Sequence, residues 1–263
     1  MRSRLRAIAQ ETVAIAEGGR YSTALGEVVI GDQVARAVAG TRLYAPDDPV
    51  YAPPPPAPPP RVTVTNESSL SASRRLGGDV ACLNFASARS PGGGFLNGAE
   101  AQEESLARAS ALYPCLLAAG DFYTHHRAHT EPVYTDRVIY SPAVPVFRDD
   151  DGELLAAPYQ VSFLTAAAPN RTVMAHDQLP GLPAVLARRA ARILDVAAAH
   201  GHRRLVLGAW GCGVFGNDPG LVASTFATAL DRRPWFDEVT FAVLDRQRGT
   251  PTLHAFARRL DGR

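Results

Sequence analysis

Three consecutive glycines, Gly92 to Gly94, stand between an apolar segment of strand length and a helix-forming segment rich in Ala, Leu and Glu. The strand is expected over 80–85, after a Gly-Gly-Asp turn signal, and the helix over 99–113. Exposed N–H groups of such a loop, together with the positive end of the helix dipole, form an anion site. The order strand, glycine loop, helix therefore predicts an α/β fold that binds a phosphate-type ligand at a strand end.

Strand-like and helical segments alternate along the chain after Pro60. The other strands are expected at 62–65, 137–140, 159–165, 204–207 and 239–244, and the other helices at 68–76, 183–200, 220–230 and 252–260, with one more running to about residue 123. An acidic turn at 149–152 separates two of the strands. This alternation predicts a three-layer α/β/α sheet, in which ligands bind at the carboxyl ends of the strands.

The first 60 residues differ in pattern from the rest. Apolar residues at helical spacing predict an amphipathic helix over 3–17, and a second helix is expected over 32–39 with Asp32 as its N-cap. Nine prolines between Tyr44 and Arg61 exclude a regular helix or central strand and indicate a polyproline II connector, with a ligand for an SH3-like partner as the alternative. We expect residues 1–60 to be an extension packed on a core formed by residues 61–263.

The glycine triplet does not fit the common phosphate loops. The chain has no lysine, which excludes a Walker loop, and no Gly-x-Gly-x-x-Gly follows the strand. Instead, Gln102, Glu103 and Glu104 come seven residues after the triplet. This signature resembles that of the poly(ADP-ribose) glycohydrolases. The segments 84–95, 138–150 and 208–219 are similar to the bacterial-type branch of that family, in the same order.

The resemblance implies a fold, a reaction and a set of catalytic groups. The fold is a three-layer α/β/α macrodomain with a mixed central sheet and an N-terminal helical extension. The reaction is hydrolysis, by exo action, of the ribose-ribose bonds of poly(ADP-ribose) without metal or organic cofactor. Glu104 would protonate the leaving oxygen and then activate water. Glu103 would accept hydrogen bonds from ribose hydroxyls, and Gln102 would support the loop.

The resemblance also implies two glycine loops around the diphosphate and a polar set around the nucleoside. Phe215 would lie beside the terminal ribose, although such a residue could simply be core. Glu67 is the candidate to accept a hydrogen bond from the adenine amino group. The alternative is that it is an N-cap or a solvated carboxylate. Ser87 and Asn84 are candidates for ribose, unless they satisfy backbone groups. The loop residues implied are Gly92, Gly93, Gly94, Gly211, Cys212, Gly213, Val214, Phe215, Gly216 and Asn217, and tight turns are the alternative for the glycines.

The residues taken without the resemblance favour a plainer interpretation of the glutamates. Residues 97–100 read as a capping box, and Glu104 with Arg108 would make an i,i+4 ion pair on a solvated helix. By the capping argument the helix begins at Asn97, and otherwise nearer Gln102. Both starting points stay open at this stage.

The other polar residues that could bind a metal or act as a nucleophile give weaker indications of function. His125, His126 and His129 are interpreted as loop histidines, because no acidic or cysteine partner follows at zinc spacing. The acidic run 149–151 lacks a calcium-loop pattern and is expected to be a turn. Cys212 has no histidine pairing and is expected to pack within its loop.

Composition limits the setting and the partners. A net charge of +1 over 263 residues argues against broad nucleic-acid binding, so no direct DNA contact is expected. Three cysteines without Cys-x-x-Cys spacing favour a reducing cytoplasm, and no signal or membrane-spanning segment is expected. We expect a monomer whose partners are poly(ADP-ribose), ADP-ribose and ADP-ribosylated proteins. The alternatives are a non-catalytic ADP-ribose reader and a hydrolase of mono-ADP-ribosyl or O-acyl-ADP-ribose conjugates.

Overall fold

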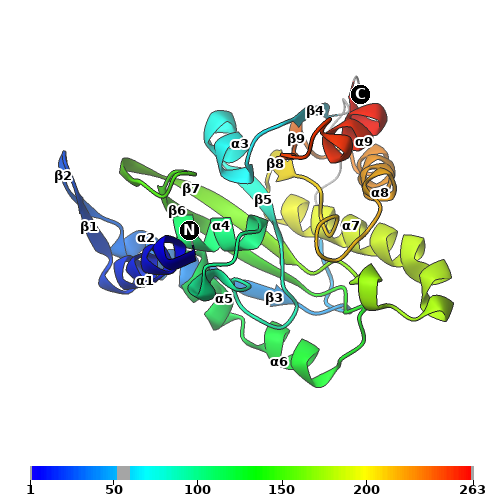
Figure 1. Ribbon diagram of the computed structural model, residues 1–263, viewed down its shortest axis with the longest axis horizontal. Coiled ribbons are helices and arrows are strands. Elements are labelled where there is room, and N and C mark those ends of the chain that lie inside the picture. The colour runs from blue at the N-terminus through cyan, green and yellow to red at the C-terminus, as the bar shows by residue number, and fades with distance from the viewer. Residues whose placement is uncertain (1, 52–59, 262–263) are drawn as a thin grey trace.

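A mixed sheet of seven strands forms the centre of the computed structural model, which describes residues 2–51 and 60–261 (Figure 1). The strand order is β3-β6-β7-β5-β8-β9-β4. Neighbours from β4 to β7 are parallel, whereas β6 runs antiparallel to both β7 and β3. The strands are β3 (Arg42–Tyr44), β4 (Arg61–Thr65), β5 (Val80–Phe85), β6 (Val138–Arg148), β7 (Leu154–Ala166), β8 (Arg204–Leu207) and β9 (Glu238–Ala242).

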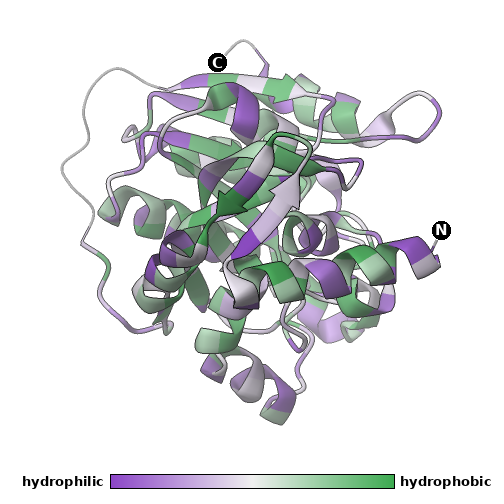
Figure 2. Ribbon diagram, turned by 90° about the vertical axis from the view of Figure 1, so that its left-hand side faces the viewer, coloured by the Kyte–Doolittle hydropathy of each residue, from purple (hydrophilic) through white to green (hydrophobic). Residues whose placement is uncertain are grey.

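Helices cover both faces of this sheet, because alternate residues of its strands enter two separate apolar cores. On β5, Ala81 and Leu83 enter one core, whereas Val80 and Cys82 enter the other. The first core is closed by α7 (Leu182–Ala199), α8 (Pro219–Asp231) and α9 (Pro251–Leu260). The second is closed by α2 (Gly31–Gly40), α3 (Ser69–Leu76), α4 (Gln102–Ala109), α5 (Leu112–Ala118) and α6 (Asp121–Ala128). Hydrophobic segments accordingly gather in the middle of the molecule, on strands and on helices (Figure 2), and the expected three-layer α/β/α arrangement is confirmed.

The N-terminal residues form α1 (Arg2–Gly18), a hairpin of β1 (Arg20–Thr23) and β2 (Gly26–Val29), then α2 and β3. Both expected helices are present, but the two strands of the hairpin and β3 were not predicted. The prediction of Asp32 as N-cap is wrong: Ile30 holds that position, and Asp32 lies in the first turn of α2. Most of the proline-rich connector, residues 52–59, lies outside the described residues.

The helix predicted over 99–113 is wrong as one element. A 3-10 turn, η1 (Phe95–Asn97), comes first, and α4 begins at Gln102, so the capping box at Asn97 is also wrong and the later start is confirmed. Ser110 then adopts extended dihedrals and bridges Val146, which separates α4 from α5. Pro114 lies in the first turn of α5, where a proline is tolerated.

Strands are present at the positions expected, 137–140 and 159–165, but both are much longer than predicted. They are parts of β6 and β7, which pair as a long hairpin closed by the acidic turn at 149–152. Two short 3-10 turns, η2 (Arg171–Val173) and η3 (His176–Gly181), join β7 to α7. No helix among the described residues is long and apolar enough to cross a membrane.

Candidate active site

The candidate site lies at the carboxyl end of β5, where α4 begins. Gln102, the first residue of α4, fixes this junction: its Oε1 accepts from the Phe85 N–H at 2.9 Å, and its Nε2 donates to the Leu83 carbonyl at 2.8 Å. The amide side chain therefore continues the hydrogen bonding of the strand where the sheet stops. The contact is with the strand, and the support of the loop expected of Gln102 stays a prediction; the same contact sets where the next two residues point.

Glu103 is buried at the end of the sheet. Its side chain is 3% exposed, its Oε2 accepts from the Ser87 N–H at 2.6 Å, and Oε1 lies 3.4 Å from Asn84 Nδ2. Burial, followed by the charge of Glu104, raises the pKa of Glu103 to about 8, although hydrogen bonds from Ser87, Asn84 and the Gly92 N–H favour the charged form. Glu103 is therefore largely protonated at neutral pH.

Glu104 points to the glycine loop and is only partly buried. Its Oε1 accepts from the Gly94 N–H at 2.9 Å. A Cβ added to Gly93 would lie 2.3 Å from this oxygen and 3.1 Å from Oε2 of Glu103. Gly93, with φ of +59°, therefore fits between the two carboxylates where no other residue could. The expected Glu104–Arg108 ion pair is not formed: Arg108 instead donates to the Ala99 carbonyl at 2.5 Å.

All three N–H groups of the glycine triplet have acceptors within the protein. The Gly92 N–H donates to Glu103, Gly93 to the Ser90 carbonyl at 2.9 Å, and Gly94 to Glu104. The sequence pattern suggested that these groups would face an anion. In the structure they hold the carboxylates and the turn, so the triplet shapes the site.

The second glycine loop, residues 208–218, follows β8 and contains backbone N–H groups that are not used within the protein. Within the part of the chain that the structure describes, the N–H groups of Gly213, Val214 and Phe215 have no protein acceptor. The base of the loop is anchored by Asn217, whose Nδ2 donates to Pro169 O at 2.8 Å and to Gly211 O at 3.1 Å. Gly216 closes the loop with an N–H bond to Gly213 O. This loop is suited to an anion.

Phe215 is half-buried at the tip of this loop. Its ring lies 6.0 Å from that of Tyr134, a residue with an unusual φ of +56°. Val214 beside it is 84% exposed. Cys212 packs lower in the loop, and burial raises the pKa of its thiol to about 12, so a thiolate is strongly disfavoured. The packing interpretation of Cys212 fits this environment.

The nucleoside candidates lie in different surroundings. Asn84 is fully buried and donates to Thr165 Oγ1 at 3.1 Å, and the Ser87 hydroxyl accepts from the N–H groups of Arg89 and Ser90. Both therefore support Glu103 and its loop. Glu67 stands after β4, three strands away from β5 in the order of the sheet, where it pairs with Arg75 at 2.6 Å.

Several residues around the carboxylates were not found from the sequence. Tyr123 of α6 is fully buried, and burial followed by the charge of Glu103 raises the pKa of its phenol. Thr165 of β7 orients Asn84. Both are distant from the glutamates in the chain, and no local pattern marks them. Arg89 and Arg127 lie beside the loop after β5, where Arg127 donates to the Arg89 carbonyl at 2.9 Å.

The interpretation of the three histidines as loop residues is wrong for two of them: His125 and His126 belong to α6. His126 is fully buried, with Nδ1 2.9 Å from the Phe122 carbonyl and Nε2 2.8 Å from Thr135 Oγ1. Burial lowers its pKa to about 4, so it is neutral. Among the described residues no three His, Cys, Asp or Glu side chains are placed to hold a metal ion.

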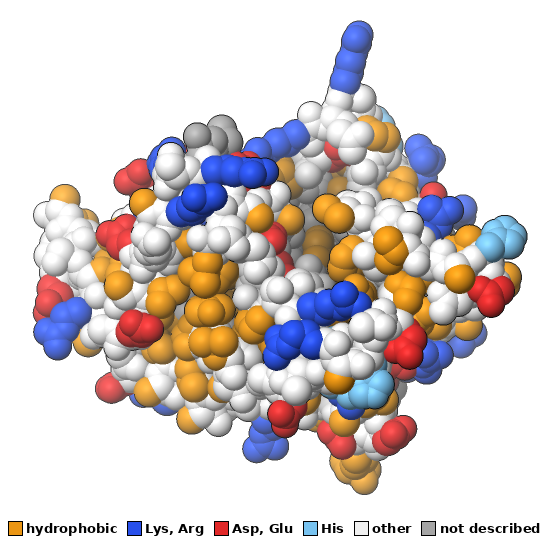
Figure 3. Space-filling view, turned by 60° about the horizontal axis from the view of Figure 1, so that its bottom comes forward, with side chains coloured by type: hydrophobic (Ala, Val, Ile, Leu, Met, Phe, Trp, Pro, Cys, Tyr) orange, Lys and Arg blue, Asp and Glu red, His pale blue; other side chains and the backbone are white. Residues whose placement is uncertain are grey.

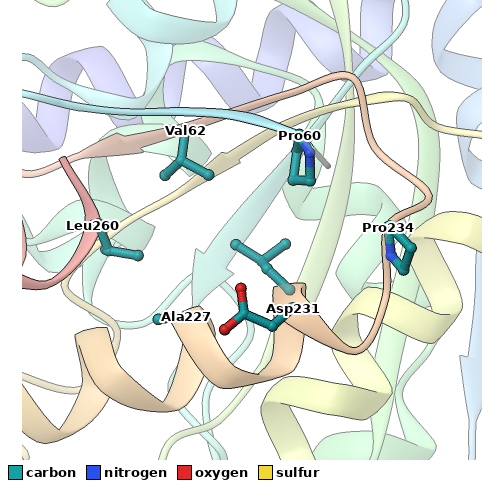
Figure 4. Close-up of a pocket in the computed structure, with 7 residues that line it drawn as sticks. Pro60, Val62, Ala227, Asp231, Pro234 and Leu260 are labelled. Carbon is teal, nitrogen blue, oxygen red and sulfur yellow. The ribbon is translucent and has the colours of Figure 1, made fainter. Parts of the chain in front are cut away.

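Figures 3 and 4 show two of the concave regions of the described part of the molecule. Figure 3 shows a hollow on the face formed by α6 and the loops after β5 and β8, with acidic atoms inside it and basic side chains at its rim. The cavity in Figure 4, about 130 Å³ in volume, is near the opposite edge of the sheet, between β4, α8 and α9. Its lining is mainly apolar, including Pro60, Val62 and Leu260. The hollow therefore fits a charged ligand better than the cavity does.

Comparison with known proteins gives consistent results. Residues 9–149 match the family model described as the catalytic domain of microbial-type PARG. Poly(ADP-ribose) glycohydrolase from Thermomonospora curvata is 54% identical, with a TM-score of 0.93 over 98% of this chain and 100% of that one. The Deinococcus radiodurans enzyme in complex with ADP-ribose is 43% identical, with a TM-score of 0.80 over 88% of this chain and 98% of that one. A search of curated proteins gave no match.

The mixed three-layer sheet, with a carboxylate pair and a glycine loop at its carboxyl edge, defines a macrodomain-like α/β protein. A carboxylate pair at such an edge is an arrangement that acid-base chemistry can use. The chain belongs to the microbial-type poly(ADP-ribose) glycohydrolase family, and its activity is that of a glycosidase acting on poly(ADP-ribose).

Proposed function

We propose that Glu104 is the general acid and then the general base for hydrolysis of the ribose-ribose bond. The observation that carries this is the contrast within the pair: Glu104 is partly exposed, whereas Glu103 is buried and accepts hydrogen bonds from Ser87 and Asn84. Glycoside cleavage needs a proton for the leaving oxygen, then removal of a proton from water. Only a carboxyl group that reaches substrate can do both.

Glu103 would then orient the ribose. With a pKa of about 8 it carries a proton at neutral pH, so it can donate a hydrogen bond to a ribose oxygen as well as accept one. The resemblance alone implies an acceptor only. A neutral Glu103 also leaves a single negative charge beside the developing oxocarbenium ion, and the bound diphosphate favours protonated carboxyls nearby.

The diphosphate of ADP-ribose would be bound mainly by the N–H groups of residues 213–215. The free donors there support this, whereas the donors of the glycine triplet are occupied. Phe215 would then lie against the terminal ribose. The adenine would extend over β8 and β9 towards Glu67, which remains our candidate for its amino group although Arg75 pairs with it.

We further propose exo action on the chain end by a monomer, with ADP-ribosylated proteins as the carriers of the polymer. The bound ligand of the Deinococcus radiodurans relative, ADP-ribose, is consistent with a product that leaves one unit at a time. The cytoplasm stays our expected compartment, since all three cysteines are free. The division into an extension, residues 1–60, and a core, residues 61–263, also stays a proposal.

Glu104→Gln tests the catalytic assignment. Release of ADP-ribose from poly(ADP-ribose), with a chelator present, should fall by at least roughly 100-fold, because removal of a general acid-base group costs this much or more. ADP-ribose affinity, measured by calorimetry, should change little. A variant that cleaves normally would contradict the role of Glu104. A wild-type chain that binds ADP-ribose but leaves the polymer intact would contradict the proposed reaction.

A further inference from the structure

Arg89 occupies the loop that holds the buried carboxylate. Its own N–H donates to the Ser87 hydroxyl, and the Ser87 N–H donates to Glu103, so two hydrogen bonds through Ser87 connect the Arg89 backbone to the Glu103 carboxylate. Its side chain is exposed and donates to the Thr130 carbonyl at 3.1 Å. A cationic group is therefore fixed beside the site by the same turn that positions Glu103.

Arg127 of α6 stands against the same turn. It donates from Nη1 to the Arg89 carbonyl at 2.9 Å and from Nη2 to Thr124 Oγ1 at 3.2 Å. Both guanidinium groups are thus oriented by neutral acceptors. Among residues 2–51 and 60–261 no carboxylate lies within ion-pair distance of either one, although Asp121 and Glu131 belong to the same segment. Their charges remain available to an anion.

The strand order shows on which side of the catalytic pair these arginines lie. From β4 the sheet runs through β9, β8 and β5 to β7 and β6. Under the proposed function, the terminal unit extends from Glu67 at β4 to the catalytic pair at β5. Arg89 and Arg127 come from the loop after β5 and from α6, which follows α5 over β6. The rest of the polymer leaves the scissile bond on this side, where Figure 3 shows basic side chains at the rim of the hollow.

We propose that Arg89 and Arg127 form a second anion site, which binds the diphosphate of the ADP-ribose unit next to the terminal one. This rests on the proposed function and adds the subsite for the leaving part of the substrate. Guanidinium groups form paired, charge-assisted hydrogen bonds with phosphate oxygens. The site therefore favours polymer over a singly ADP-ribosylated protein, which has no second diphosphate.

Binding measurements in the Glu104→Gln background test this with the polymer intact. The double variant Arg89→Gln/Arg127→Gln should bind short fluorescent poly(ADP-ribose) roughly tenfold more weakly, since two charge-assisted contacts are lost. The slope of log Kd against log salt should fall by about 1 per arginine. ADP-ribose affinity should not change. In the active chain, KM for polymer should rise in the same proportion while kcat stays constant.

Arg259→Gln is the matched control, because it removes the same charge from the far end of α9, near the opposite edge of the sheet. An equal effect there would overturn the proposal, as would an equal loss of ADP-ribose affinity in the double variant. Displacement of polymer by single-stranded RNA at equal charge, abolished by the double variant, would make the surface a nucleic-acid site instead. If the active chain leaves polymer uncut, the proposed reaction fails, whereas binding to Glu104→Gln still decides the role of the arginines.

Discussion

Gly93 separates two carboxylates that belong to adjacent residues of one helix. Its left-handed backbone and missing side chain allow Glu103 and Glu104 to approach the loop from the same direction. The N–H groups of the triplet then bind the carboxylates themselves. At the scale of single residues, the glycines of the triplet therefore position the two carboxylates, and under the proposed function the second loop binds the diphosphate.

Gly93→Ala should destabilise the fold by roughly 2–4 kcal/mol, because it combines a strained φ with overlap of both carboxylates. The rate of polymer cleavage should also fall, by at least as much as the loss of folded protein accounts for, because the added Cβ displaces the Glu104 carboxylate. Urea denaturation and an activity assay on the folded variant measure the two effects. Gly181→Ala is the control: its Cβ meets nothing within 4 Å, its φ is −79°, and it should change stability by less than about 1 kcal/mol.

The buried Glu103 predicts a pH effect on stability. Because its pKa is raised from 4.5 to about 8 on folding, its protonated form is favoured in the folded state, and stability is lost as pH rises from about 4.5 to about 8. Glu103→Gln removes this loss. The difference in unfolding free energy between the variant and the wild type should grow by roughly 2–4 kcal/mol across that window. Denaturation at pH 5 and pH 8.5 measures it, and a constant difference would contradict the assignment.

The identity of the carboxylate pair could be predicted from the Gln-Glu-Glu triplet, but the separate environments of its members could not. Periodicity indicates only that neighbouring helical side chains diverge. Which of them is buried depends on Asn84, Ser87 and Thr165, which come from β5, its following loop and β7. These contacts exist only once the sheet is assembled.

Among the elements, α1 is connected to the catalytic helix through buried polar contacts. Thr12 Oγ1 donates to the Arg108 carbonyl at the end of α4 at 2.7 Å and accepts from Arg148 Nε at 3.0 Å. Arg148 is 3% exposed and pairs with Glu11 at 2.6 Å. Arg6 also donates to the Asn97 carbonyl of η1. The N-terminal helix thus fixes both ends of the segment that carries the glutamates.

Thr12→Val should therefore destabilise the protein by roughly 1–3 kcal/mol, because Arg148 and the Arg108 carbonyl lose a buried partner while the side-chain volume is kept. Thr12→Ser keeps the hydroxyl and should retain most of the stability. Thermal and urea unfolding of both variants give the comparison. Equal stability of the Val and Ser variants would show that the hydroxyl contributes nothing.

The elements predicted best were those with strong periodicity, such as α7 and β5. The break after α4 was missed because its residues favour a helix: the backbone turns at Ser110 in order to pair with Val146, and the Ala111 N–H donates to Pro145 O. The β1–β2 hairpin was missed because its Ala-Leu tip has no turn signal. Tertiary pairing overrode local propensity in both places.

In the whole molecule, the N-terminal residues belong to the sheet as well as covering it. β3 pairs with β6 through Leu43 and Ile139, and Ile30 and Val34 enter the second core. A chain that starts at residue 61 should therefore expose the edge of β6 and an apolar face, and it should aggregate when expressed. Size-exclusion chromatography and circular dichroism test this. A monomeric, cooperatively folded fragment would support an independent core domain instead.

The two strands that flank the proline-rich segment, β3 and β4, lie at opposite edges of the same sheet. During synthesis on a ribosome β4 emerges early. Thr63 can pair only after its partner Thr240, 177 residues further on, has been synthesised. At roughly 5 to 20 residues per second, that interval lasts about 9 to 35 s. The nascent chain carries an unpaired strand throughout, and translation is almost complete when the sheet closes. Cotranslational protection by chaperones during this interval would matter more for this protein than for one whose neighbouring strands are consecutive.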